Sequence, residues 1–445
     1  MMMTKKLTIE DFDLIQIVMI DMNGIPRGKL VPRTVARRSL GLEFGIIAHV
    51  MGTGTDLPYN VHEIIHSNFG NGLAVPDLDS LAELPWASRP GCRVGQVLCH
   101  MLYEDGRTEP TSPRNNAVRQ IKKLELLGFK LSSSMTLQFT AYKSQDGKIV
   151  SFLGGNNHQT IATYCSIGVE DLMLGVCEQL RLAGVNVESW TSGGGPGSFE
   201  LSLAVTDGVK AADMAYRLKH GVKAVMAKHG YQVTFMTHPC GTDIYSGCTF
   251  RFTAHNAIGG NMFHDDTADD KLSTLARNWI SGMLQHGAGL TALCCPTVNC
   301  YSRLVHDVTS PKLVTWDLDN LSACVNVKVI GNDVWIENRI PSSASNPYLV
   351  LLATIAAGID GIEKNMTCPD KFRSDALKAP QSLEEALVGL KTDKVLEEAL
   401  MSLLLKAFLD IKSSSEVEKF KELETSDDKS EKTRQLEEHL YLSRI

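Results

Sequence analysis

The sequence has no long apolar run and no excess of positive charge. Residues 1–14, MMMTKKLTIEDFDL, lack the apolar core of a secretory signal peptide, and no later stretch reaches the roughly 20 apolar residues that cross a bilayer. The net charge is −7 and the isoelectric point is near 6.0, so the charge does not favour nucleic acid or an anionic membrane as a partner. We therefore expect a cytoplasmic protein with neither kind of partner.

The cysteines lack the spacing of a metal site or of a disulfide framework. There are 11 of them, an odd number, and Cys294, Cys295 and Cys300 have no partnering histidine cluster. This usage is typical of reduced, buried thiols. The sequence also has no repeat of solenoid period, and the glycines at 193–195 lack the Gly-Lys-Ser/Thr of a phosphate loop, so we interpret them as a flexible turn.

What is present is enough chain for two or three domains, with helical and strand-like patterns in alternation. A chain of 445 residues can bury a large core. The polar, proline-containing segment 102–114 is typical of a domain junction, and we place the boundary so that residues 1–108 and 109–445 form separate domains. The mixed pattern predicts an α+β fold with an antiparallel sheet. We expect helices at 113–127, 169–183, 210–229, 267–286, 347–362 and 394–412, and strands at 134–142, 197–205, 246–254 and 325–339.

Two shorter features carry local predictions. Asn23-Gly24 stands between the alternating runs DLIQIVMID and IPRGKLVP, which predicts a hairpin with a type I′ turn. The tail from Ser413 onward is rich in charge, so we expect a solvated helix or a frayed end there.

The most informative stretch runs from Trp335 to Asn365. Glu337 and Arg339 alternate with apolar residues, so a strand would place the carboxylate and the guanidinium on one face. Asn346 and Pro347 then predict the start of a helix that is apolar nearly all round and must be buried. Taken alone, Glu337 and Arg339 are also compatible with an ordinary ion pair of the surface or core.

This stretch resembles the signature of the glutamine synthetase superfamily, in which a strand ending E-x-R leads into N-P-Y-L and a helix rich in Ala and Gly. The wording D-x-N-G-x-x-R-G-K at 21–29 resembles the opening of the β-grasp domain of that family. The resemblance implies an N-terminal β-grasp domain, followed by a catalytic-fold domain whose antiparallel sheet forms a funnel surrounded by helices. It further implies that the glutamate at position 337 binds a divalent metal and that the arginine at 339 holds a carboxylate or phosphate of the substrate.

The same resemblance locates the other metal ligands of the family, and most have been replaced. The replaced ligand positions, with two further changed positions beside them, are Thr136, Gln138, Gly193, Ser198, Thr249 and Arg251. Only Glu200 and Glu337 keep a carboxylate, and in the family these two serve different ions. Because hard cations need several carboxylate oxygens, we expect no metal and regard Glu200 and Glu337 as vestigial ligand positions.

The positions that handle anions are also depleted. Arg303 and Arg339 match arginines of the family that contact the substrate, and we regard them as vestigial substrate-binding residues. The acidic residue of the flap falls on Thr309, and two further arginines fall on Leu321 and Asn326. An aspartate serving the ammonium site of a neighbouring subunit could correspond to Asp56, Asp77 or Asp79.

These losses make the chain resemble the non-catalytic, glutamine-synthetase-like proteins of the vertebrate lens more than a working enzyme. The resemblance implies no catalytic residues and no cofactor. It implies a homo-oligomer of stacked hexameric rings that acts as a structural or interaction protein, with intermediate-filament or other cytoskeletal partners. We also expect Glu337, deprived of its metal, to pair with Arg251 or Arg303.

Two alternatives remain open. One is an ATP-dependent glutamate–ammonia or γ-glutamyl–amine ligase with a rebuilt site for Mg²⁺ or Mn²⁺. The other is a binder of an amino acid or nucleotide that uses Arg303 and Arg339 without turnover.

Overall fold

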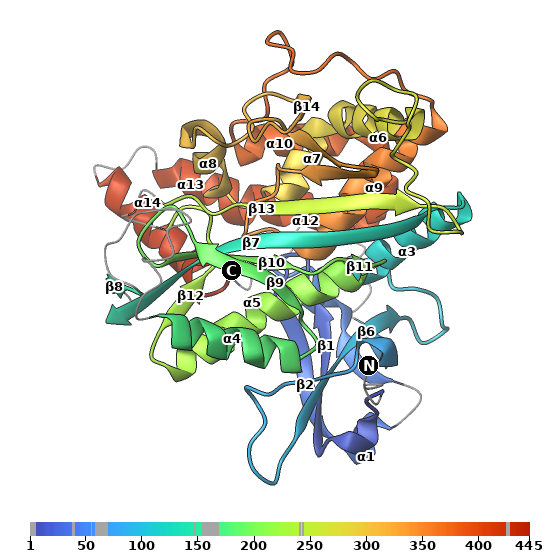
Figure 1. The fold of residues 1–445 in the computed structure, drawn as a ribbon. Helices are drawn as coiled ribbons and strands as arrows, with labels where there is room; N and C mark the ends of the chain where they lie inside the picture. Colours follow the sequence, from blue (N-terminus) through green and yellow to red (C-terminus); the bar gives the residue numbers. More distant parts are fainter. Residues whose placement is uncertain are drawn as a thin grey trace.

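The computed structural model describes residues 6–37, 41–54, 56–57, 70–145, 148–153, 169–239, 242, 244–423 and 428–445. These residues form two β-sheets and the helices packed on them, which confirms the α+β prediction (Figure 1). The strands of the first sheet lie between Leu14 and Leu102, and those of the second between Lys130 and Asn338. A domain boundary after residue 108 stays a prediction.

The N-terminal sheet has the strand order β2-β1-β6-β4-β3, and β5 pairs with β6. The neighbours β1 and β6 run parallel, whereas the other pairs are antiparallel. The bounds are β1 (Leu14–Ile20), β2 (Pro26–Pro32), α1 (Arg33–Ala36), β3 (Leu42–Gly45), β4 (Asn71–Pro76), β5 (Ala82–Glu83) and β6 (Val94–Leu102).

The second sheet has the order β14-β15-β16-β13-β7-β10-β9, and β8, β11 and β12 add to its long strand β7. Only β14 and β15 run parallel. The bounds are β7 (Lys130–Gln145), β8 (Lys148–Phe152), β9 (Val187–Ser192), β10 (Ser198–Leu203), β11 (Thr206–Asp207), β12 (Gln232–Thr234), β13 (Cys248–His255), β14 (Trp316–Leu318), β15 (Val325–Ile330) and β16 (Asp333–Asn338).

The helices follow the predicted order, with two differences. Their bounds are α3 (Pro113–Leu126), α4 (Glu170–Leu182), α5 (Lys210–Lys228), α6 (Thr274–Gln285), α7 (Gly287–Cys294), α8 (Cys300–His306), α9 (Pro347–Glu363), α10 (Leu383–Thr392), α11 (Lys394–Leu400), α12 (Ser402–Ile411), α13 (Glu418–Leu423) and α14 (Lys429–Glu437). The helix expected at 267–286 begins only at Thr274, because the Ser273 hydroxyl caps it there. The helix expected at 394–412 is broken at Met401, whose φ is 66°.

Helix α9 is the buried helix that the sequence predicts. Asn346 caps it by accepting from the backbone N–H of Tyr348 at 2.9 Å, and Pro347 is its first residue. The Asn346 amide also donates to the carbonyl of Asp21 at 2.9 Å, so the cap joins α9 to the N-terminal hairpin. Gly358 faces Trp279 of α6 so closely that an added Cβ would lie 2.1 Å from the indole ring.

The hairpin between β1 and β2 forms, but the prediction of a type I′ turn is wrong. The loop runs from Asp21 to Ile25, and within it only Gly24 has a positive φ, of 81°. The buried carboxylate of Asp21 decides this shape because it accepts from the N–H groups of both Asn23 and Ile25 at 2.9 Å.

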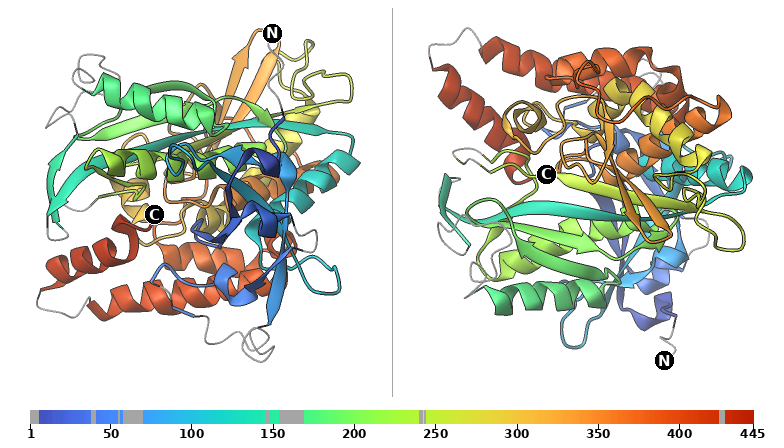
Figure 2. Two further views of the ribbon diagram at one scale, coloured as in Figure 1. Left: turned by 90° about the horizontal axis from the view of Figure 1, so that it is seen from below. Right: turned by 45° about the horizontal axis from the view of Figure 1, so that its top comes forward.

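The end of the chain is buried, contrary to the solvated tail that we expected. Helix α14 has no buried residue, but Leu440, Tyr441, Leu442 and Ile445 are at most 6% exposed. The carbonyl of Ile445 accepts from the N–H of Phe235 beside β12, and both views of Figure 2 show the C-terminus against the central elements. The charge-rich composition hid these few apolar residues because they occupy only the last turn.

Candidate functional site

A cavity of about 430 Å³ opens on the second sheet and brings together the four candidate site residues, whereas Gly193, Ser198, Arg251 and Asn326 are not part of its lining. Glu200 comes from β10, Glu337 from β16, Arg303 from α8, and Arg339 from the segment after β16. The cavity is also lined by Thr136, Gln138, Gly247, Cys248, Thr249, Asp307, Thr309, Ser310, Leu321 and Lys328. The strand register explains this convergence, because β7 lies between β10 and β13, and β13 lies beside β16.

Glu200 is held by a neutral carboxamide. It lies opposite Gln138 in the β10–β7 register, and the Gln138 amide Nε2 donates to Glu200 Oε2 at 2.8 Å. The other end of the same amide, Oε1, accepts from the N–H of Gly247 at 2.8 Å. Both ends of the Gln138 side chain are therefore engaged, and its amide fixes the glutamate from the neighbouring strand.

Glu337 is held in the same way by Asn326. The two residues are opposite each other in the β15–β16 register, and Asn326 Nδ2 donates to Glu337 Oε2 at 2.8 Å. The prediction that Glu337 pairs with Arg251 or Arg303 is wrong. Within the described ranges, Glu337 makes no ion pair. Arg251 lies opposite Glu337 in the β13–β16 register, but its guanidinium stacks over the Trp335 ring at 4.4 Å.

Arg303 is occupied by the backbone next to the site. Its Nη2 donates to the carbonyls of Ile340 and Pro341 at 2.5 and 3.1 Å, and its Nη1 donates to Ser310 Oγ at 3.1 Å. These bonds account for why Arg303 does not reach Glu337. Its Nε is buried without a hydrogen-bond partner.

Arg339 remains closer to the open cavity. Its Nε donates to the carbonyl of Leu321 at 2.8 Å. Burial is the largest influence on its pKa and lowers it, the charge of Glu337 raises it, and the charge of Arg303 lowers it further.

Two cavity residues were missed by the sequence comparison, Asp307 and Lys328. Asp307 lies two residues before the flap position and accepts from both the N–H and the hydroxyl of Thr309 at 2.9 Å. Lys328 lies two residues after Asn326 on β15, so strand alternation puts it on the same face. That period of two is the signal that could have found Lys328.

The aspartates considered for an ammonium site lie outside this cavity. Asp77 accepts from Arg114 at 2.7 Å, Asp79 pairs with Lys6, and Asp56 pairs with Lys419. Asp77 and its partner belong to a network that ties the N-terminal part of the chain to α5, because Arg114 also pairs with Asp213 at 2.9 Å.

The residues present do not fit the divalent metals that the family implies. The two carboxylates are each covered by an amide from the adjacent strand, and Thr136 Oγ1 is hydrogen-bonded to Ser202 Oγ at 3.0 Å. Within the described part of the chain, no three His, Cys, Asp or Glu side chains are grouped to hold a metal. A divalent cation loses its hydration shell only where several carboxylate oxygens replace it, and this donor set offers two separate, hydrogen-bonded ones.

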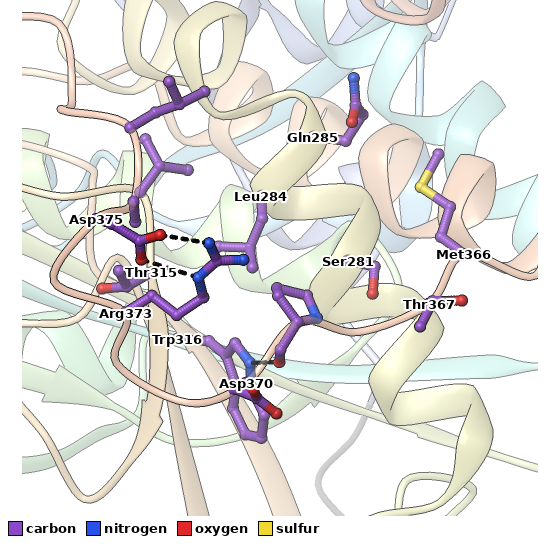
Figure 3. A pocket seen from close by; sticks show the side chains of 14 residues that line it. Ser281, Leu284, Gln285, Thr315, Trp316, Met366, Thr367, Asp370, Arg373 and Asp375 are labelled. Atoms are coloured by element: carbon purple, nitrogen blue, oxygen red, sulfur yellow. Dashed lines mark hydrogen bonds and ion pairs between the residues drawn. The ribbon is translucent and has the colours of Figure 1, made fainter.

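A larger cavity, of about 600 Å³, lies away from the funnel between α6, β14 and the segment 366–377 (Figure 3). Arg373 and Asp375 neutralise each other, since the guanidinium of Arg373 binds both carboxylate oxygens of Asp375 at 2.6 and 3.0 Å, and Asp370 is the remaining charge of the described lining. The Trp316 indole N–H is likewise occupied by the carbonyl of Pro369. We find no convergent reactive groups there.

The family follows from comparison with known proteins. Residues 110–431 match the model of the glutamine synthetase catalytic domain. The chain belongs to the glutamine synthetase family. This confirms the resemblance read from the signature at 335–365. As part of the same family, the chain shares its fold with ligases and with lengsin.

The similar proteins include both lengsin and a named ligase. Lengsin of Homo sapiens is 29% identical over 421 residues, which cover 88% of this chain and 78% of lengsin. The glutamate–isopropylamine ligase of a Pseudomonas species is 26% identical over 391 residues, covering 85% of this chain and 84% of the ligase. The solved complex of GmaS with ADP has a TM-score of 0.80 and 27% identity, and the match covers 92% of this chain and 94% of GmaS.

In the described segments, no helix combines the length and apolar content needed to cross a bilayer.

Proposed function

We propose that this chain is a non-catalytic member of the glutamine synthetase family that works as a homo-oligomeric structural or interaction protein. One observation carries the proposal: the amides of Gln138 and Asn326 donate to the two remaining carboxylates, Glu200 and Glu337. A carboxylate that accepts from a neutral amide is satisfied without a metal, so the hydrogen bonds replace the cations that the family uses.

The remaining charges of the funnel do not suit phosphoryl transfer. Stabilising a transferring phosphoryl group needs metal ions or several fixed cations aimed at its oxygens. The Nη atoms of Arg303 donate to Ile340, Pro341 and Ser310. The other two positions that hold arginine in the family are Leu321 and Asn326 in this chain. No step of a ligase mechanism can therefore be assigned to these side chains.

The test is ATP-dependent phosphate release by the purified protein. Glutamate is supplied with ammonia or isopropylamine, and with Mg²⁺ or Mn²⁺. We expect no release above the protein-free rate, while the Pseudomonas ligase in the same assay serves as the positive control. Release that requires glutamate and is lost in Glu337→Ala would show that the chain is a ligase.

Assembly is the second part of the proposal. The resemblance carried by the sequence implies a homo-oligomer of stacked hexameric rings in the cytoplasm with cytoskeletal partners, and we propose these for this chain. Mass measurement in solution at micromolar concentration should give a large assembly rather than a monomer. Co-sedimentation with assembled intermediate filaments should then retain the protein in the pellet, and its recovery only in the supernatant would contradict that partner class.

A second candidate function is favoured by the cationic side of the funnel. Arg303, Arg339 and Lys328 line one cavity, but Lys328 pairs with Asp319 and both Nη atoms of Arg303 are engaged, so Arg339 is the cation that best suits a carboxylate or phosphate. This supports a non-catalytic binder of an amino acid or nucleotide, and it is also the feature that a rebuilt ligase would retain. Calorimetric titration with glutamate and with ADP separates the candidates, because a pure scaffold gives no heat of binding, and only a ligase also releases phosphate.

A further inference from the structure

A third cavity, of about 400 Å³, lies where the N-terminal sheet meets α3 and the junction of α11 with α12. It is remote from the funnel in the sequence and shares no lining residue with it. Its apolar wall includes Val75, Leu102 and Val118, and its polar wall includes His100, Arg119 and Lys122.

The charge of this cavity is of one sign. Among the described residues that line it, Arg119 and Lys122 are cationic and none is acidic, although the chain as a whole has a net charge of −7. Three acids on neighbouring segments are engaged elsewhere: Asp77 pairs with Arg114 at 2.7 Å, the exposed Glu398 lies 3.9 Å from Lys123, and the buried Glu109 lies 3.1 Å from His49.

His100 lies in the polar wall of the same cavity, and its pKa is lowered. Burial is the main cause that lowers the pKa of His100, and the charges of Arg114 and Lys122 lower it further, against the opposing charge of Asp77. The His100 Nε2 lies 3.6 Å from Asp77 Oδ2, yet that carboxylate does not reverse the shift.

Arg119 lines this cavity and is held in place by the end of α11. Its Nη2 donates to the carbonyls of Glu398 and Ala399 at 2.6 and 2.8 Å. Its Nε is buried and has no partner among the described residues, so a ligand in the cavity would meet Arg119 through the charge of its guanidinium rather than through this N–H.

Met401 adds a strained backbone at the same place. It lines the cavity between α11 and α12, with φ of 66° and ψ of 137°, a region that residues other than glycine seldom occupy. The conformation is enforced from α3, because the Asn116 amide donates to the carbonyl of Leu400 at 3.0 Å. Strain of this kind concentrates at ligand clamps and switch regions.

We propose that this cavity binds a small organic anion, with its carboxylate or phosphate at Arg119 and Lys122 and its apolar body against Val75, Leu102 and Met401. The two cations Arg119 and Lys122, the absence of acid from the described lining, and the apolar wall together favour an amphiphilic anion over a sugar or a free inorganic ion. The site is independent of the funnel, so it stands whether or not the chain is a ligase.

The experiment is calorimetric titration of the intact protein with octanoate, octyl phosphate and octanol as probes of one apolar body. We expect octanoate or octyl phosphate to bind at millimolar concentration or tighter, and octanol to bind about tenfold more weakly than the better anion. The preference between the two anions identifies whether the natural ligand is a carboxylate or a phosphate. Failure of both anions to bind, or equal binding of octanol, would overturn the proposal.

Variants assign the binding to this cavity. Lys122→Gln should weaken the anion about threefold, because an exposed cation contributes modestly. Lys123→Gln is the matched control on the same helix, since Lys123 does not line the cavity. Arg119→Gln should weaken binding about tenfold or more. If Arg119→Gln fails to fold, the comparison of Lys122→Gln with Lys123→Gln decides, and equal effects of those two would overturn the assignment.

Discussion

At the scale of single residues, two neutral carboxamides decide how the glutamates of the funnel are satisfied. Gln138 and Asn326 each sit directly across from a glutamate in the strand register, at 2.8 Å from its oxygen. An amide on the adjacent strand thus satisfies each carboxylate. The arginines that could have done so are turned to Trp335 and to backbone carbonyls instead.

Removing the amide of Asn326 should destabilise the fold through Glu337. Asn326→Ala leaves one oxygen of a half-buried carboxylate unpaired, and also the N–H of Asn320, which donates to Asn326 Oδ1 at 2.9 Å. We expect a loss of about 1–3 kcal/mol in the free energy of unfolding. Urea denaturation followed by far-UV circular dichroism measures it.

A double-mutant cycle tests whether that loss belongs to the pair. Combining Asn326→Ala with Glu337→Gln should give a coupling energy of about 0.5 kcal/mol or more, because the two residues are in direct contact. The matched cycle pairs Arg251→Gln with Glu337→Gln and should give a smaller coupling, since Arg251 stacks on Trp335. A larger coupling energy for Arg251 with Glu337 than for Asn326 with Glu337 would contradict this and support the ion pair predicted from the sequence.

At the scale of elements, the packing of α9 against α6 depends on glycines that let the two helices approach closely. Gly358 meets the Trp279 ring, and Gly282 of α6 meets the Ala357 carbonyl, with an added Cβ at 2.1 and 2.0 Å respectively. The small residues of α9 and α6 are therefore needed for close packing of the two helices, and not for backbone flexibility.

Substituting Gly358 by Ala should separate α9 from α6 and destabilise the protein. The new methyl group cannot fit beside the buried Trp279, so we expect a loss of about 1–3 kcal/mol or more. Gly175→Ala in α4 is the control, because its Cβ would meet nothing within 4 Å, and it should stabilise by about 0.4–1 kcal/mol. Thermal unfolding of both variants gives the comparison.

At the scale of the whole molecule, one histidine connects the central helices to the C-terminal ones. His286, between α6 and α7, lies 3.1 Å from Asp360 of α9 and 2.7 Å from Asp393, which caps α11. Burial is the largest influence on the pKa of His286 and lowers it, but the hydrogen bonds and charges of Asp393 and Asp360 outweigh it, so the pKa is raised above 6.5.

The sign of the pH dependence follows from that shift. A histidine whose pKa is raised on folding contributes stability that is fully present below its unfolded pKa of 6.5 and is lost as the pH rises through the folded pKa. The difference in unfolding free energy between the wild type and His286→Gln should therefore shrink as the pH is raised from about 6 to 8. The exposed His229→Gln is the control and should show no such trend.

The unfolding free energy of the wild type must be compared with that of His286→Gln at each pH, because other groups change the total stability in the opposite direction. Burial lowers the pKa of Lys223 to about 7 and that of Lys219 to about 8, and both contributions become more favourable to the folded state as the pH rises. Total stability alone would mix these effects. A difference that stays constant across this pH range would contradict the role of His286.

The order and type of most elements could be predicted from the sequence because they depend on local signals. The cap at Asn346 and Pro347, the apolar helix α9 and the alternating strand β16 are written in consecutive residues. The signature of residues 335–365 also determined the family, and strand alternation placed Glu337 and Arg339 on one face. These features need only the geometry of a helix or a strand.

What the sequence could not supply are the contacts between distant segments. The amide of Asn326 meets Glu337, the last residue Ile445 packs beside β12, and the strained Met401 closes a cavity against α3, because strand register and helix packing bring these groups together. The sequence by itself predicted the family and the α+β fold, and both predictions are confirmed, whereas the loss of metal-ligand residues that the resemblance implies stays a prediction. Only the tertiary structure decided which partner each remaining charge took, since hydrogen bonds form between neighbours in space and a side chain takes the nearest donor that the folded backbone presents.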